Sequence, residues 1–162
     1  MKKVMLMVSF LMITIVASAQ GWYSGGEIGI WRDKGAKSTN FSLVPDFGYN
    51  FSDKWSAGAK VGFYHESEPN LSALTMDAYV RYTYYRNGMV SLYADGGAGF
   101  GTIDVDGYQV GISPGIALKL DDHFSILASF GYFGYRDKYH GENGFGIHAK
   151  SSDLKFGFYY SF

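Results

Sequence analysis

Acidic and histidine side chains stand close together at several polar stretches of the chain. Asp104 and Asp106 form one pair of carboxylates, and Asp137 and His140 form an acid–histidine couple. Side chains of these types activate water for hydrolysis when they converge on one site. Acids are also common in solvated loops, and no distinctive spacing links these two groups. We therefore predict solvated loop charge and no catalytic residue, with a hydrolytic enzyme kept as an alternative.

Metal ligation is a second chemistry that the residue types allow. His65-Glu-Ser-Glu68 and His140-Gly-Glu142 bring nitrogen and oxygen donors together. Neither group has the closed ligand set of a recognisable zinc motif. Glycine pairs such as Gly99-Phe-Gly101 lack the strand–loop–helix context of a phosphate loop. We predict no metal and no cofactor.

The positions of the remaining charges depend on the strands that carry them. Strand-like segments alternate with turn signals, and most have about the 9–11 residues with which a tilted strand crosses a bilayer. There is no second domain, and no later segment has the 18 consecutive apolar residues of a membrane helix. The eight expected strands are residues 22–31, 40–51, 55–64, 75–85, 90–101, 109–120, 124–133 and 153–162.

Strict alternation gives each strand one apolar and one polar face. The apolar faces together hold 43 positions and no charged residue, whereas 18% of the whole chain is charged. The opposite faces carry many small residues, which suit the crowded lumen of an eight-stranded barrel. They also carry the charged residues Glu27, Asp46, Lys60, Asp77, Arg81, Asp95, Lys119, Asp153 and Lys155.

Three features favour a barrel whose apolar face is outside, over a soluble barrel with an apolar interior. The polar face is rich in Gly, Ser and Tyr, which make a poor solvent surface. Aromatic residues gather near both strand ends, as in the girdles of membrane barrels. The connections alternate between three tight turns (52–54, 86–89, 121–123) and longer loops (33–39, 65–74, 102–108, 134–152), and short periplasmic turns with longer external loops are typical of such barrels.

The N-terminal segment predicts export. Met1-Lys-Lys3 precedes an apolar run to Val16, and Ala17-Ser-Ala19 supplies small residues for cleavage, which is the pattern of a secretory signal peptide. We expect residues 1–19 to be removed after Ala19 and residues 20–162 to form one barrel domain. That mature chain has 12 basic and 15 acidic residues, a net charge of −3, so nothing favours nucleic acid as a partner.

Charges inside a barrel need partners, because an unpaired buried charge is costly. A hairpin centred near Asp53 places Asp46 opposite Lys60, and one centred near Gly88 places Arg81 opposite Asp95. Glu27 lies at a similar depth, within expected reach of Lys155. We predict a mid-barrel network of ion pairs and hydrogen bonds formed by Glu27, Asp46, Lys60, Arg81, Asp95 and Lys155.

Two prolines conflict with regular pairing. Pro45 and Pro114 stand inside expected strands, where the missing N–H interrupts a ladder. We expect local bulges at both positions.

Several stretches of the chain resemble the small outer-membrane barrels of the OmpA/OmpX-like superfamily, especially the outer membrane protein beta-barrel domain type common in Bacteroidetes-like bacteria. The C-terminal stretch resembles the aromatic signal that the barrel-assembly machinery reads. The resemblance covers essentially the whole mature chain and implies a closed all-β, eight-stranded, antiparallel, up-and-down transmembrane barrel in the cell outer membrane. The stretches that carry it are 41–49, 52–55, 78–82, 92–100, 113–117 and 156–162.

The group is diverse in function, so the resemblance implies a location and a fold more than an activity. We expect a non-enzymatic structural or surface-interaction protein, with a narrow ion channel as one alternative. A lipid A-modifying or proteolytic barrel is the other, although the His-x-Ser pair of lipid A deacylases has no match, since His148 is followed by Ala149 and Lys150.

The longest expected loop, 134–152, offers mixed chemistry for partners. We predict that it contacts lipopolysaccharide phosphates or a host or cell-surface ligand through Arg136, Lys138, Tyr139, His140 and Lys150.

Overall fold

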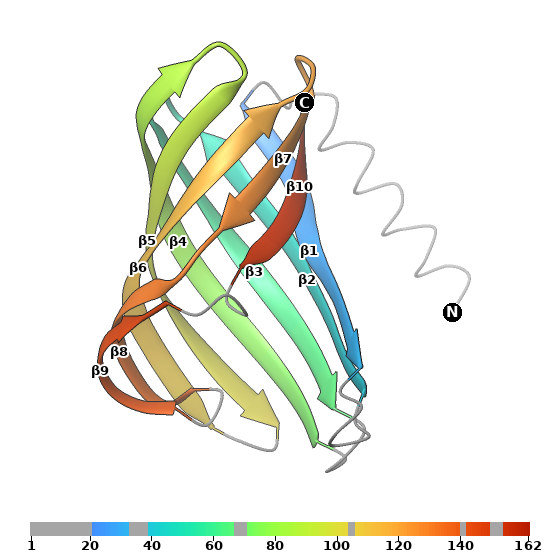
Figure 1. Cartoon of the computed structure of the whole chain (residues 1–162), viewed down its shortest axis with the longest axis vertical. Coiled ribbons are helices and arrows are strands. Elements are labelled where there is room, and N and C mark those ends of the chain that lie inside the picture. The colour runs from blue at the N-terminus through green and yellow to red at the C-terminus, as the bar shows by residue number, and fades with distance from the viewer. Residues whose placement is uncertain (1–20, 33–38, 67–70, 104–105, 140–141, 150–153) are drawn as a thin grey trace.

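The computed structural model describes residues 21–32, 39–66, 71–103, 106–139, 142–149 and 154–162. These residues form an antiparallel, all-β structure, as predicted (Figure 1). This part of the chain contains no helix long and apolar enough to cross a membrane. The ten strand segments are β1 (Trp22–Arg32), β2 (Thr39–Asn50), β3 (Trp55–Glu66), β4 (Leu71–Asn87), β5 (Val90–Ile103), β6 (Gly107–Lys119), β7 (Phe124–Ser129), β8 (Tyr132–Tyr139), β9 (Glu142–His148) and β10 (Lys155–Ser161).

The segments close into a barrel of eight strands. Strands β1 to β6 pair in chain order, and β6 pairs with β7. Strand β10 then pairs with β7 on one side and with β1 on the other, which completes the ring. Both ends of the described chain, Gly21 and Phe162, therefore lie at the end of the barrel that carries the tight turns (Figure 1). We call this the periplasmic end, because short turns lie on the periplasmic side in membrane barrels.

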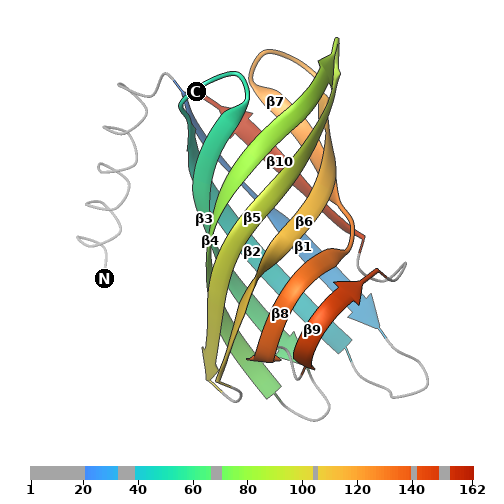
Figure 2. The same ribbon diagram turned by 90° about the vertical axis from the view of Figure 1, so that its left-hand side faces the viewer.

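The seventh and eighth strands each consist of two segments. Segment β8 continues the course of β7 and pairs with β6, and β9 returns along β8. Residues 134–152, predicted as a loop, are therefore largely a hairpin that extends the barrel wall (Figure 2). The prediction failed because this stretch is polar and rich in glycine, without the alternation that marked the other strands.

A bulge separates β7 from β8 and reverses the alternation of side chains. Ser129 pairs with Gly115, but Phe133 pairs with Ile112, so β7–β8 holds one extra residue. Gly131 has a φ of 74° there, a left-handed conformation that suits glycine. Tyr132, predicted on the outer face near a rim, consequently faces the lumen. A one-residue insertion always exchanges the faces of the strand beyond it.

Most of the outer face follows the prediction, apart from a second bulge between Thr83 and Tyr85 in β4. Large apolar side chains along it are exposed, including Phe47, Val80, Ile112 and Phe158. Aromatic contacts surround the periplasmic end, where the rings of Trp22 and Tyr49, Trp55 and Tyr82, and Tyr160 and Phe162 lie 4.6–5.3 Å apart. Exposed apolar groups with an aromatic girdle suit a lipid environment.

The two prolines behave differently from the prediction. The β2–β3 register is the same on both sides of Pro45, so the expected bulge is absent there. Near Pro114 a bulge does occur, but on the neighbouring strand, at the β7–β8 junction, where the Phe130 N–H bonds to the Pro114 carbonyl at 3.0 Å. The expected signal peptide and its cleavage after Ala19 lie outside the described residues.

Candidate functional site

Four tyrosines from four strands fill the periplasmic half of the lumen. Tyr23 (β1), Tyr79 (β4), Tyr93 (β5) and Tyr159 (β10) are all buried. The rings of Tyr23 and Tyr159 stack with their centroids 4.8 Å apart. With Asp46, Arg81 and Asp95 they form what we call the plug.

Glycines on the paired strands make room for these rings. Tyr23 pairs with Gly48, Tyr79 with Gly58, and Tyr93 with Gly115. A Cβ atom on any of these glycines would collide with the tyrosine opposite. The abundance of glycine on the polar faces thus positions the aromatic plug.

Asp46 is the most deeply buried side chain of the plug, only 1% exposed. The Tyr79 hydroxyl lies 2.9 and 3.0 Å from its two carboxylate oxygens, and the Tyr159 hydroxyl donates to the second oxygen. Tyr23 joins the cluster through a 2.7 Å hydroxyl contact with Tyr79. Hydroxyl donors therefore stabilise this carboxylate within the lumen.

Arg81 and Asp95 form the charged half of the plug. They are opposed in the β4–β5 register, as predicted. Two parallel hydrogen bonds, Nε–Oδ1 at 2.6 Å and Nη2–Oδ2 at 2.7 Å, make the pair bidentate. The guanidinium also lies 4.0 Å from the centroid of the Tyr93 ring. Such pairs hold their geometry tightly.

Lys60 does not bond to the carboxylate that the register places opposite it. Asp46 and Lys60 are register partners, as predicted. The Lys60 ammonium nevertheless reaches past β2 to Glu27, at 3.1 Å. Lys155, the partner expected for Glu27, lines the same space. The six predicted residues thus lie together in the lumen, but Lys60 pairs with Glu27 and not with Asp46.

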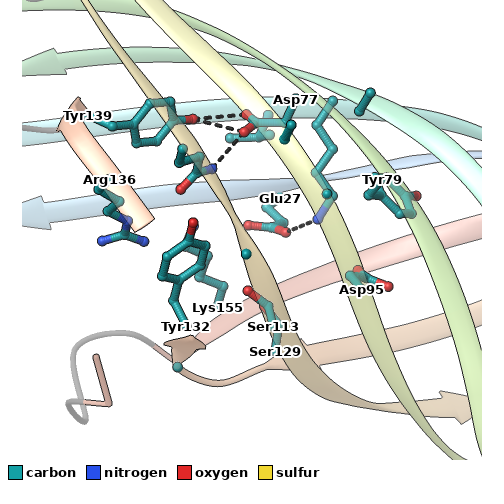
Figure 3. A pocket seen from close by; sticks show the side chains of 18 of the residues that line it. Glu27, Asp77, Tyr79, Asp95, Ser113, Ser129, Tyr132, Arg136, Tyr139 and Lys155 are labelled. Atoms are coloured by element: carbon teal, nitrogen blue, oxygen red, sulfur yellow. Dashed lines mark hydrogen bonds and ion pairs between the residues drawn. The ribbon is translucent and has the colours of Figure 1, made fainter. Parts of the chain in front are cut away.

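A cavity of about 380 Å³, which we call the chamber, lies directly beyond the plug (Figure 3). Glu27, Asp77 and Lys155 line it, and each lies on the external side of its own strand's plug tyrosine. Tyr79 and Asp95 also reach the chamber and form its floor. The chamber is therefore closed towards the periplasmic turns and lies in the external half.

Asp77, Gln109 and Tyr139 form a hydrogen-bonded group in the chamber that sequence reasoning missed. Gln109 Nε2 donates to Asp77 Oδ1 at 2.7 Å, and the Tyr139 hydroxyl lies 3.0 Å from both carboxylate oxygens (Figure 3). Asp77 was on the predicted polar face but was not assigned to the predicted network, although the β3–β4 register places Lys60 opposite it. Its partner Tyr139 was assigned to a loop.

The residues predicted for a surface loop divide between two environments. Tyr139 is 4% exposed and bonds to Asp77, and Arg136 lies over the Tyr132 ring with its guanidinium carbon 4.1 Å from the centroid. Both line the chamber from β8, which is a strand of the wall and not the predicted loop. Lys138 is exposed. His140 and Lys150 lie outside the described residues.

The acids and histidines considered for catalysis or metal binding do not converge in the described part of the chain. Asp106 accepts a bond from Thr102 at 3.0 Å, and His65 Nδ1 contacts the Ser72 hydroxyl at 3.1 Å. No group of three metal-binding side chains occurs among the described residues. Asp104, Glu68 and His140 lie outside them.

Comparison with known proteins agrees with this architecture. The family model for the outer membrane protein beta-barrel domain matches residues 4–162. No curated protein matches the chain. A closed barrel with an apolar outer face, an aromatic girdle and a polar lumen is what this family description requires. The chain belongs to the outer membrane protein beta-barrel domain family and is a barrel of the outer membrane.

Proposed function

We propose that this barrel is a non-enzymatic surface-interaction protein that does not conduct ions. The observation that carries the proposal is the plug, whose six central side chains (Tyr23, Asp46, Tyr79, Arg81, Tyr93 and Tyr159) are each no more than 9% exposed. An eight-stranded barrel has an interior only wide enough for side chains. The polar groups of the plug bond to one another, which supports a structural closure over an ion path.

Because the plug closes the lumen, we assign contacts with partners to the external end of the barrel. It carries the chamber and the exposed end of the β8–β9 hairpin, where Lys138 and Phe145 face outward. Lipopolysaccharide in the same leaflet and ligands on other cell surfaces are the partners that this end would meet. Contact with the barrel-assembly machinery during insertion is part of the same proposal.

Conductance in a planar bilayer tests the closed lumen. The folded protein should give no unitary current steps, because the plug leaves no continuous water path. The double variant Tyr79→Ala with Tyr159→Ala, which removes the two rings against Asp46, should produce steps if the rings are the barrier. Discrete steps from the wild-type barrel would overturn the proposal in favour of a channel.

Binding of purified lipopolysaccharide to the barrel in micelles tests the surface role. Replacing only Lys138 and Phe145 by serine spares the β8 residues that face the chamber. We expect weaker binding with an unchanged fold, whereas unchanged binding would count against this surface. An altered lipid A mass spectrum in cells that carry the protein would instead indicate an enzyme.

A further inference from the structure

The barrel wall closes in its periplasmic half but is open on one side of its external half. Strands β1 and β10 pair only from Tyr23 to Glu27. Beyond Glu27, Ile28–Arg32 of β1 pair with β2 alone within the described part of the chain. Strand β9 likewise pairs only with β8 among the described residues. The external half thus has two one-sided strand edges, the β1 edge (28–32) and the β9 edge (142–148), which Figure 1 shows on opposite sides of the lower half of the barrel.

The β1 edge presents a row of backbone donors and acceptors to the gap. The Trp22 carbonyl accepts a bond from Phe162, so the backbone groups of Trp22 face the β10 side. Successive residues of a strand turn their N–H and C=O groups to opposite sides, and the β1–β2 register is unbroken as far as Arg32. The backbone groups of Ile28, Ile30 and Arg32 therefore face the gap. An edge of this kind is a template for a strand of another chain.

Both edges lie in the lipid-facing part of the wall. Exposed apolar side chains stand beside them on the outer face, Ile28 and Leu43 at the β1 edge and Phe145 and Ile147 on β9. Backbone groups without partners are not tolerated in hydrocarbon, because no water is present to bond to them. The gap also adjoins the polar chamber, which Glu27 lines from the last paired position of β1. The occupant of the gap must therefore supply strand edges at this depth and a polar side towards the chamber.

From these features we propose that a second copy of this chain fills the gap, so that each copy closes the other. A two-fold axis along the membrane normal brings β9 of one copy to β1 of the other and forms the reciprocal pair at the same time. The directions are compatible, because β1 runs towards the external end and β9 runs back from it, which makes both pairs antiparallel. Arg32 ends β1 and Glu142 begins β9, so residues of opposite charge come to the external end of each pair.

The surfaces match as well as the edges. The two chambers face each other, polar side to polar side, and the apolar outer faces remain in contact with lipid. A single foreign strand in the gap would run parallel to one of the two edges, and parallel pairing is slightly less stable than antiparallel pairing. The second copy pairs antiparallel with both. This pairing goes beyond the surface-interaction role and does not depend on it.

Sedimentation equilibrium of the mature barrel, purified alone in density-matched detergent micelles, tests the dimer. We expect the mass of two chains, and a single-chain mass at every concentration would overturn the proposal. Ile30→Pro removes an N–H that faces the gap without removing a bond to β2. It should weaken the dimer at least ten-fold, because the symmetry makes the substitution act at both pairs.

Ile30→Ala is the matched control, because it shortens the side chain and keeps the N–H. It should change the dimer constant much less than Ile30→Pro, and equal weakening would contradict pairing through the backbone. If Ile30→Pro gives no heat-shifted band on a gel, Arg32→Pro replaces it at the end of the strand. An unchanged dimer constant in a folded proline variant would also overturn the proposal.

Cysteine cross-linking locates the contact, since the sequence contains no cysteine. Chains with Ile28→Cys and chains with Ile147→Cys are folded together and treated with a short bifunctional maleimide. We expect dimers that contain one chain of each kind. Val80→Cys, exposed on the outer face of β4, is the control and should cross-link to neither.

Two outcomes of the cross-linking would overturn the proposal. A chain that carries both Ile28→Cys and Ile147→Cys would form an internal cross-link if β9 closed on β1 within one barrel. A dimer mass without cross-links in the mixture of single variants would place the interface on another face.

Discussion

Arg81 shows how a charge is held inside a barrel without a water shell. Its guanidinium has a bidentate carboxylate on one side and the faces of tyrosine rings around it. Each contact compensates part of the desolvation of the ion. Arg81 is therefore stable in the lumen because all of these contacts are present. Loss of either Arg81 or Asp95 would leave the other charge to bear its full desolvation cost.

Removing Arg81 alone should be worse than removing the whole pair. Arg81→Met leaves Asp95 buried and unpaired, and we expect it to lower the free energy of unfolding by about 3–5 kcal/mol. The double variant Arg81→Met with Asp95→Leu should lose less. Urea unfolding in lipid vesicles measures both, and a double variant less stable than the single one would contradict this explanation.

Gly48 is a residue whose missing side chain is essential. Gly48→Ala places a methyl group against the Tyr23 hydroxyl, which its contact with Tyr79 holds in place. We expect a loss of about 1–3 kcal/mol in unfolding free energy, as for other overpacked interiors. Gly96→Ala is the matched control, because a Cβ atom there meets nothing within 4 Å. Equal effects at the two positions would rule out the steric cause.

At the level of the secondary-structure elements, hydrogen bonds within the tight turns help to stabilise the periplasmic end of the barrel. In the turn between β6 and β7, Asp121 accepts hydrogen bonds from the backbone N–H groups of His123 and Phe124, both at 2.7 Å. These bonds hold the pKa of Asp121 below its ordinary value of 3.8. A carboxylate that begins a turn in this way stabilises the folded form only while it is ionised.

The stability of this turn should therefore depend on pH with a definite sign. Because the folded pKa is depressed, the Asp121 contribution is fully present above the ordinary value and is lost as the pH falls through the folded pKa. The gap in unfolding free energy between wild type and Asp121→Ala should be constant near neutrality and shrink below about pH 4. A gap that grows on acidification would exclude this role.

Strand positions were predictable where alternation was strict, and less so where a single residue broke it. The turn centres near Asp53 and Gly88 gave the Asp46–Lys60 and Arg81–Asp95 registers correctly. A glycine within a strand is a weak signal of a bulge, but this chain has 22 glycines and Gly131 did not stand out among them, so Tyr132 was placed on the wrong face. The Lys60–Glu27 bond spans two strand spacings, and hairpin symmetry predicts only directly opposed residues.

The chamber was the least predictable part for the same reason. Tyr139, Arg136 and Tyr132 reach it only because β8 continues the wall, while their sequence context is that of a polar loop. Asp77 and Gln109 come together across β4, β5 and β6, so no pairwise pattern joins them. The charges on the polar face predicted a network in the lumen. Which of them belong to the plug and which to the chamber could be seen only once the register of all the strands was known.

For the whole molecule, closure of the ring predicts a simple physical behaviour. The mature protein folded in detergent should run as a compact band on a gel and shift after boiling, because the closed barrel resists the detergent until heated. The barrel should also need detergent to stay in solution, since its outer face is apolar. An unshifted band with good solubility in buffer alone would indicate that the apolar face is not exposed.

The seam between β1 and β10 has a consequence for the order of folding. It joins Tyr23–Glu27 to Gly157–Ser161 through five register pairs, whereas β3 and β4 share twelve. Every other neighbouring contact in the periplasmic half forms between segments closer in sequence, so closing this seam carries the largest loop entropy. Backbone amides of β1 and β10 should be the last to gain protection from hydrogen exchange during assembly and the first to lose it. The β1–β10 pair is therefore where the barrel should open first during unfolding.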